Sequence, residues 1–142
     1  MDVDGVLNCN STTVFTRSGA QFVEDKLIER LKTIVSATEA KIILSSDWRY
    51  DREPPYDADF LELKNKLLGH GIKIHGYTPI YYGQDRGFEI NAWLNSHPKV
   101  KKFVILDDRC DMFPVKHRLV RTDPNVGLTD EDVEEAIWLL SN

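Results

Sequence analysis

The sequence predicts an α/β domain in which strands and helices alternate and the strands form a parallel sheet. Two apolar runs of strand length, residues 42–44 and 103–106, each end abruptly at polar residues. A third polar cluster opens the chain, where Asp2 and Asp4 flank a single valine ahead of a glycine. Strands of parallel sheets are apolar on both faces, and ligand sites in open α/β sheets lie at the carboxyl ends of the strands. We therefore expect the three polar clusters to meet in one crevice.

Periodicity and end signals predict the individual elements. Strands are expected over residues 42–44, 72–75, 103–106 and 118–121, and helices over residues 24–38, 57–68, 86–95 and from Thr129 to about Leu140. Gly69 and Gly71 end the second helix, and Thr129 is expected to cap the last one together with Asp132. The apolar residues at helical spacing are Leu27, Ile28, Leu31, Ile34 and Val35 in the first helix, Phe60, Leu61, Leu67 and Leu68 in the second, and Val133, Ala136, Ile137 and Leu140 in the last.

Length and composition indicate a single domain over residues 1–142. The hydrophobic and charged contents, 42% and 29%, are those of a globular protein, and no apolar run approaches the roughly 20 residues that a bilayer requires. An acidic start lacks the basic region of a signal peptide, so we expect a cytoplasmic protein with no membrane contact. Cys9 and Cys110 are isolated thiols without metal-ligand spacing, which agrees with a reducing compartment.

The opening motif carries the first chemical prediction. If Asp2 ends a strand, alternation directs Asp2 and Asp4 to one side, and Gly5 lets the backbone turn beneath a ligand. One carboxylate can then attack a substrate while the other moves a proton. An acidic terminus that only interacts with solvent is the alternative for these residues taken alone.

In order and spacing, the polar clusters resemble the motifs of the haloacid dehalogenase (HAD) superfamily. The matching stretches are Asp2–Asn8 (DVDGVLN), Leu44–Arg49 (LSSDWR), Arg86–Leu94 (RGFEINAWL), Val104–Arg109 (VILDDR) and Thr122–Thr129 (TDPNVGLT). They are most similar to the HAD domain of Swiss-army-knife RNA repair proteins, and more distantly to the phosphatase half of polynucleotide kinase/phosphatase. The resemblance implies a three-layer sandwich around a parallel, Rossmann-like sheet.

The resemblance also implies a Mg²⁺-dependent phosphatase. Asp2 is the expected nucleophile, which forms an aspartyl-phosphate, and Asp4 is the expected general acid and base. The carboxylates of Asp2, Asp107 and Asp108, with the backbone carbonyl of Asp4, provide the all-oxygen ligands that Mg²⁺ prefers. Asp111 belongs either to the surroundings of this site or to a helix N-cap.

Phosphate binding is assigned by the same resemblance. Gly5 and Ser45 are expected to bind the transferring phosphate, with Ser46 the rival of Ser45, since alternation lets only one of the two face the crevice. Arg86 matches the basic position of the repair-type members, although much of the superfamily has lysine there and an ordinary surface arginine is the alternative. Arg49 is included as a further phosphate ligand, and Trp48 beside it is expected to pack rather than to stack on a base.

Two departures from the superfamily pattern affect the expected function. Only Met1 precedes Asp2, so the first, central strand is expected to be truncated, which favours a non-catalytic partner-binding module as an alternative. The segments 8–23 and 50–85 leave no room for an inserted cap domain, so the site is expected to be open.

An open site suits a phosphate that protrudes from a large substrate, and RNA or DNA ends with a 3′- or 5′-phosphate are the leading expectation. A small patch of basic residues is expected to assist: Arg49, Arg52, Arg86, Arg109 and Lys116. The net charge of −5 favours the other alternative, a phosphatase of nucleotides or sugar phosphates, because nucleic-acid binders are typically basic. The oligomeric state is not indicated by the sequence.

Overall fold

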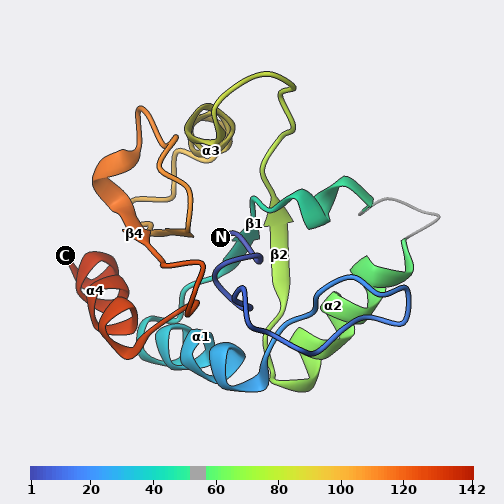
Figure 1. Ribbon diagram of the computed structural model, residues 1–142. Helices are drawn as coiled ribbons and strands as arrows, with labels where there is room; N and C mark the ends of the chain where they lie inside the picture. The colour runs from blue at the N-terminus through green and yellow to red at the C-terminus, as the bar shows by residue number, and fades with distance from the viewer. Residues whose placement is uncertain (52–56) are drawn as a thin grey trace.

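The computed structural model describes residues 1–51 and 57–142, in which helices surround two short parallel sheets (Figure 1). The α-helices are α1 (Asp25–Thr38), α2 (Ala58–Gly69), α3 (Arg86–Asn95) and α4 (Asp130–Ser141). The strands are β1 (Ile42–Leu44), β2 (Ile74–Tyr77), β3 (Ile105–Asp107) and β4 (Leu119–Arg121), and short 3-10 helices lie at Asp47–Asp51 and Lys116–Arg118. The predicted order of strands and helices is confirmed.

Local sequence signals account for most of the helix ends. Thr129 and Asp132 form the predicted capping box at the start of α4, with reciprocal backbone hydrogen bonds of 2.8 and 3.2 Å. Asp57 caps α2 by accepting a hydrogen bond from the backbone N–H of Asp59. Gly71 adopts a left-handed φ of +79° just after α2, as the glycine signal predicted.

The predicted inner face of α2 needs a correction. Phe60 and Leu67 are buried as expected, but Leu61 and Leu68 are 37% and 47% exposed. Leu63 is buried in their place, because positions 60, 63 and 67 lie on one face of an α-helix while 61 and 68 lie beside that face.

The strands form two separate two-stranded sheets, β1–β2 and β3–β4, so the prediction of a single parallel sheet is only partly correct. The first two residues of the chain lie between these sheets. Met1 donates from its amino group to the carbonyl of Ile43 at 2.8 Å and accepts from the N–H of Ser45 at 2.9 Å, while Asp2 N–H donates to Leu106 at 2.9 Å. Met1 and Asp2 therefore join β1 to β3 as a strand end would.

A groove of about 700 Å³ continues between the two sheets from Met1. Its walls are mainly apolar side chains of β1, β3, α1 and α3, such as Ile43, Ile105, Ile34 and Ile90. Among residues 1–51 and 57–142, the backbone hydrogen bonds that bridge β1 and β3 are those of Met1 and Asp2, and the truncated central strand stays a prediction.

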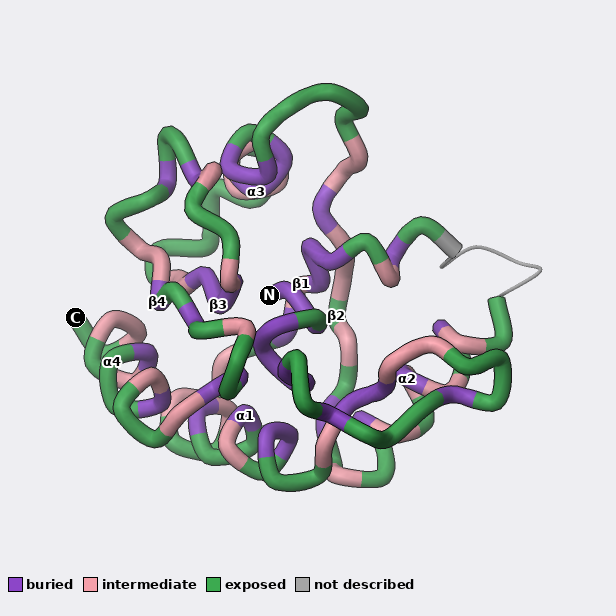
Figure 2. Tube along the Cα trace, in the orientation of Figure 1, coloured by how far each residue is buried: buried purple, intermediate pink, exposed green. Residues whose placement is uncertain are grey.

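The core has two parts, which lie on opposite faces of β3 (Figure 2). Leu106 belongs to the larger cluster, which is formed with α1, α2 and α4, whereas Ile105 belongs to a smaller cluster with Ile90 of α3. Successive strand residues point to opposite faces, so helices pack on both sides of β3. This arrangement is compatible with the expected α/β fold, and the complete three-layer sandwich stays a prediction.

The two segments in which a cap domain could have been inserted are short, as expected. Residues 8–24 contain one isolated bridge, between Phe15 and Gln21, and the described part of 50–85 holds α2 and β2. Over the ranges 1–51 and 57–142, no helix has the length and apolar character needed to cross a bilayer.

Candidate active site

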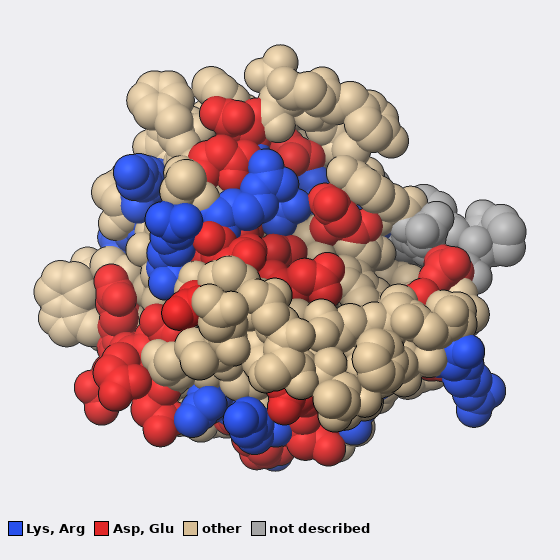
Figure 3. All heavy atoms as spheres, in the orientation of Figure 1, with Lys and Arg blue, Asp and Glu red and all other residues tan. Residues whose placement is uncertain are grey.

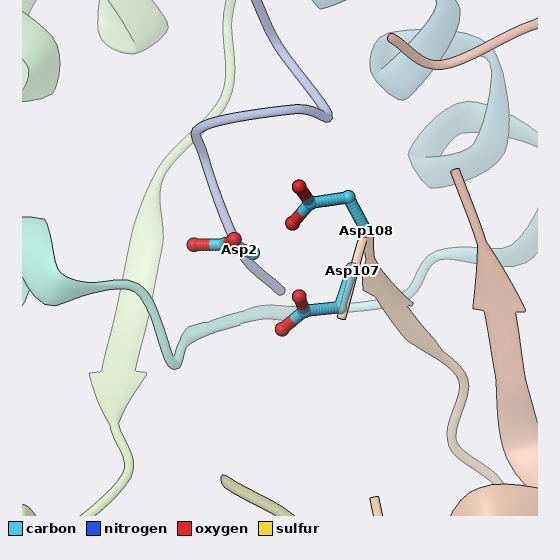
Figure 4. Close-up of side chains that lie close together, drawn as sticks. All are labelled: Asp2, Asp107 and Asp108. Carbon is cyan, nitrogen blue, oxygen red and sulfur yellow. The ribbon is translucent and has the colours of Figure 1, made fainter. Parts of the chain in front are cut away.

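Three carboxylates converge at the carboxyl end of β3 (Figure 4). Asp107 is the last residue of β3, Asp108 follows it, and Asp2 approaches from the segment that bridges the sheets. One oxygen from each lies within 4.8 Å of the other two. Asp2 and Asp107 are buried, with 6% and 0% of their surface exposed. The structure thus brings together three of the four residues predicted to bind the metal.

The electrostatics of this cluster indicate that it suits a cation. Burial, and next the charge of Asp2, raise the pKa of Asp107 to about 7, and the same two causes raise the pKa of Asp108. Buried carboxylates that repel one another are stabilised in their charged form by a positive ion. An all-oxygen donor set suits Mg²⁺, so these residues fit the metal that the sequence predicts.

Arg86 is the cation next to the acidic cluster. Its Nη1 lies 3.2 Å from Asp2 Oδ1 and 3.2 Å from Asp107 Oδ2, and its Nη2 lies 3.0 Å from Asp47. Only 4% of Arg86 is exposed, so the alternative of an ordinary surface arginine is wrong. Asp111 accepts a hydrogen bond from the backbone N–H of Arg86 at 3.1 Å, and it thereby fixes the start of α3. Asp111 therefore belongs to the surroundings of the site, whereas the N-cap position of α3 is held by Asp85.

Asp4 lies outside the carboxylate cluster, in a defined orientation. Its Oδ1 accepts a hydrogen bond from Asn8 Nδ2 at 2.8 Å, and its Oδ2 accepts one from Trp48 Nε1 at 3.1 Å. Asn8 Oδ1 also accepts the backbone N–H of Gly5 at 2.9 Å. Asp4 itself is exposed, so its carboxylate is positioned by neighbours and remains accessible to a substrate. Its backbone carbonyl as a metal ligand stays a prediction.

Gly5 is required where it stands. Its φ of +79° is left-handed, and a Cβ there would lie 2.7 Å from Asp108 Cγ. Thr122 Oγ1 donates to the Gly5 carbonyl at 2.7 Å and holds the turn in place. The glycine therefore allows the opening motif to approach Asp108 closely.

Ser45 and Ser46 follow β1 directly, and the structure distinguishes between them. Ser46 Oγ accepts the backbone N–H of Trp48 at 3.3 Å. Ile42 and Leu44 belong to the larger core cluster, so alternation directs Ser45 to the opposite face, toward α3. Asp107 points to the same face, because it lies two residues after Ile105. Ser45 rather than Ser46 therefore shares a face with the acidic cluster.

Two predicted phosphate ligands carry buried polar atoms that have no hydrogen-bond partner among the described residues. They are Ser45 Oγ and Arg86 Nε, and Thr78 Oγ1, just after β2, is a third. Unpaired buried polar atoms are uncommon in native proteins, and a bound ligand, ion or water is one explanation for them. Sequence reasoning missed Thr78, whose only signal is its position after a strand.

Arg49 has a different environment from the one predicted for a phosphate ligand. It is fully buried, and its guanidinium donates to the carbonyls of Ser45, Ser46, Thr78 and Pro79 and to the carboxylate of Glu89. These contacts occupy all five N–H donors of an arginine, so none remains for a phosphate. Arg49 instead fixes the ends of β1 and β2 relative to α3, on which Glu89 lies.

The other predicted residues are placed as follows. Trp48 is half-buried against the core, as expected, and it also donates to Asp4. Arg109 lies beside the site, Lys116 lies at the amino end of β4 and so away from it, and Arg52 falls outside the described residues. Sequence reasoning gave no role to Asn8, Asp47 or Thr122, although all three stand within or beside the recognised motifs.

Asp107 and Asp108 follow strand β3, Asp2 and Asp4 lie in the opening turn, and the buried Arg86 contacts both Asp2 and Asp107. This arrangement defines a site of the haloacid dehalogenase class. A family model described as the HAD domain in Swiss Army Knife RNA repair proteins matches residues 1–133, and the chain belongs to this family. The resemblance inferred from the motifs is thereby confirmed. No curated protein and no solved structure matches the chain.

Proposed function

We propose that this protein is a Mg²⁺-dependent phosphatase that hydrolyses phosphomonoesters through an aspartyl-phosphate on Asp2. The position of Asp2 supports the proposal most directly. At the end of β3, its carboxylate lies next to those of Asp107 and Asp108 and contacts Arg86. Arg86 Nη1 lies 3.2 Å from Asp2 Oδ1 and orients this carboxylate, and a carboxylate can attack phosphorus without first losing a proton.

The two chemical steps use Asp2 and Asp4. In the first step an Asp2 oxygen bonds to phosphorus, the bond to the ester oxygen breaks, and Asp4 gives that oxygen a proton. In the second step Asp4 takes a proton from water, the water oxygen attacks the same phosphorus, and phosphate leaves with Asp2 regenerated. Asn8 and Trp48 hold the Asp4 carboxylate in one orientation for both transfers.

The remaining residues bind the transferring group. The unpaired Nε–H of Arg86 and the unpaired hydroxyl of Ser45 are donors suited to phosphate oxygens. Asp2, Asp107 and Asp108 would hold Mg²⁺, which supplies positive charge to the anionic substrate when it is bound. Gly5 permits the close approach of the opening turn to Asp108.

For the substrate we propose a phosphorylated end of RNA, with DNA ends second. The description of the family refers to RNA repair proteins, and the short segment 8–24 places no additional helix over the crevice. A small-molecule phosphatase is the competing proposal, and the net charge of −5 favours it.

Phosphate release from an aryl phosphate tests the reaction, measured with Mg²⁺ and again after chelation. We expect Asp2→Asn to lose turnover by at least about a thousandfold, because the nucleophile is removed. The matched control is Asp130→Asn on α4, since the carboxylate of Asp130 is 77% exposed and pairs with Arg30 on the surface. Acid quenching during turnover should leave a phosphoryl group on the peptide that contains Asp2. Full activity of Asp2→Asn, or a phosphoryl group on another peptide, would contradict the proposal.

The same assay, run on a phosphorylated oligoribonucleotide and on the matching mononucleotide, tests the substrate. Higher kcat/KM on the oligomer supports RNA ends, whereas preference for the mononucleotide supports the small-molecule alternative. Absence of phosphate release from every ester would favour the non-catalytic module.

A further inference from the structure

The charged residues around the crevice are distributed unevenly. Lys and Arg side chains gather beside the acidic centre of the face shown in Figure 3. On the Asp108 side, Arg109 follows the acidic pair in the chain and Arg121 ends the neighbouring strand β4. Because β3 and β4 are parallel, Arg121 lies at the same carboxyl edge as Asp107, its partner in the strand register.

Arg121 is the more available of these two cations. Its Nε donates to the backbone carbonyl of Asp108 at 3.0 Å, which places the guanidinium beside the metal-binding residue. The residue is exposed, and no carboxylate among residues 1–51 and 57–142 pairs with it. Arg109, by contrast, binds Asp111 through two hydrogen bonds of 2.9 and 2.6 Å, so much of its charge is neutralised.

The opposite side of the crevice is acidic. A pocket of about 470 Å³ lies beside Asp4 and Trp48, and its wall includes the carboxylates of Asp47, Asp57 and Asp59. An anionic chain that extended through this pocket would meet like charges, which disfavours that path. A polyanion attached to the reacting phosphate is therefore directed toward Arg121.

We propose that Arg121 binds a second phosphate of the substrate, the phosphodiester next to the reacting end of a single-stranded nucleic acid. This inference rests on the proposed phosphatase function and defines its substrate class more narrowly. Arginine suits this task because its planar guanidinium forms paired hydrogen bonds to phosphate oxygens, and the Nη atoms of Arg121 are available for them. Arg109 adds a weaker contribution.

The test compares kcat/KM for a 3′- or 5′-phosphorylated oligoribonucleotide with that for the matching mononucleotide, in the wild type and in Arg121→Ala. We expect Arg121→Ala to lower the oligomer-to-mononucleotide ratio by about three- to tenfold at low salt, and Arg109→Ala to lower it less. The salt dependence should also weaken, with the slope of log kcat/KM against log salt falling by about 0.7 for one lost contact to a single strand. The matched control is Lys116→Ala, an exposed cation at the amino end of β4, which should leave the ratio unchanged.

A binding measurement keeps the two proposals distinguishable. Fluorescence anisotropy of a labelled, phosphorylated oligoribonucleotide is followed with Asp2→Asn and with Asp2→Asn/Arg121→Ala, so turnover is not needed. Weaker and less salt-dependent binding of the double variant supports the role of Arg121 even if the wild type releases no phosphate. Equal binding by both proteins overturns it, and so does an equal loss of activity on both substrates, which would mean that Arg121 only supports Asp108. Inactivity of the wild type toward all esters would overturn the phosphatase proposal alone.

Discussion

The buried ion pair between Arg49 and Glu89 leads to a prediction about stability. Their side chains are only 1% and 9% exposed, so the pair belongs to the buried class of salt bridges. Removal of one partner from a buried pair leaves an uncompensated charge and costs about 3–5 kcal/mol. A domain of this kind has a total stability of about 5–15 kcal/mol, so Glu89→Leu should remove about a fifth of it or more.

The paired substitutions make the reasoning more specific. Glu89→Leu leaves the Arg49 cation buried alone, and Arg49→Met leaves the Glu89 carboxylate alone, whereas the double variant leaves neither charge. We therefore expect the double variant to be more stable than the sum of the single effects predicts, by about 3 kcal/mol. Glu89→Gln keeps an acceptor for Arg49 and for the N–H of Tyr81, so it should cost less than Glu89→Leu.

Urea unfolding at neutral pH measures these differences, with the slope against denaturant checked for each variant. The control is Asp130→Ala, which removes a surface pair with Arg30 whose side chains are 32% and 77% exposed. That substitution should cost at most about 1 kcal/mol. A loss of unfolding free energy below about 1 kcal/mol for Glu89→Leu, or strictly additive losses in the double variant, would refute the conclusion that Arg49 and Glu89 form a stabilising buried pair.

Three further predictions concern the metal, the opening turn and pH. Asp108→Asn should weaken Mg²⁺ binding by more than about tenfold in calorimetry, because a charged oxygen ligand is lost; unchanged affinity would place the ion elsewhere. Gly5→Ala should destabilise the fold by about 1–2 kcal/mol or more and weaken Mg²⁺ binding, since its Cβ would contact Asp108 in a left-handed conformation; wild-type unfolding and affinity would contradict this. His70 contacts Glu29 and Asp25 at 2.6 and 2.8 Å, which raise its pKa above 6.5; the stabilisation that His70→Gln removes should thus be greatest below pH 6.5 and disappear as the pH rises through the raised value. Unfolding of both proteins at acidic and alkaline pH measures the difference, and a constant gap would argue against the ionised pair.

Local signals in the sequence predicted most of the fold. The bounds of α3 and β1 agree with the expected ranges, and the capping box at Thr129 forms as expected, because the signals that predict these elements lie within or next to them in the sequence. The strand expected at residues 72–75 occurs instead at Ile74–Tyr77. Its pairing with β1 fixes this position, and pairing is a long-range contact that periodicity does not contain.

The site residues that could be predicted are those that stand in the recognised motifs and carry a charge of the expected sign. Asp2, Asp107 and Asp108 converge as the motif order implied, and Arg86 contacts two of them. Arg49 could not be assigned, since five acceptors from three separated segments surround it and only the folded chain brings them together. Arg121 was missed for the same reason, because only the pairing of β4 with β3 brings it next to Asp108.

The position of Asp2 between the two sheets links the proposed site to the stability of the whole molecule. Ser45 follows β1 in one sheet, Asp107 ends β3 in the other, and the bridging segment of Met1 and Asp2 lies between them. A metal ion or phosphate that contacted groups of both sheets would bind only the folded chain, because folding brings those groups together. At one hundred times its dissociation constant, such a ligand adds about 2.7 kcal/mol to the stability of the folded state. Ligand binding at the site and folding of the chain are therefore thermodynamically coupled.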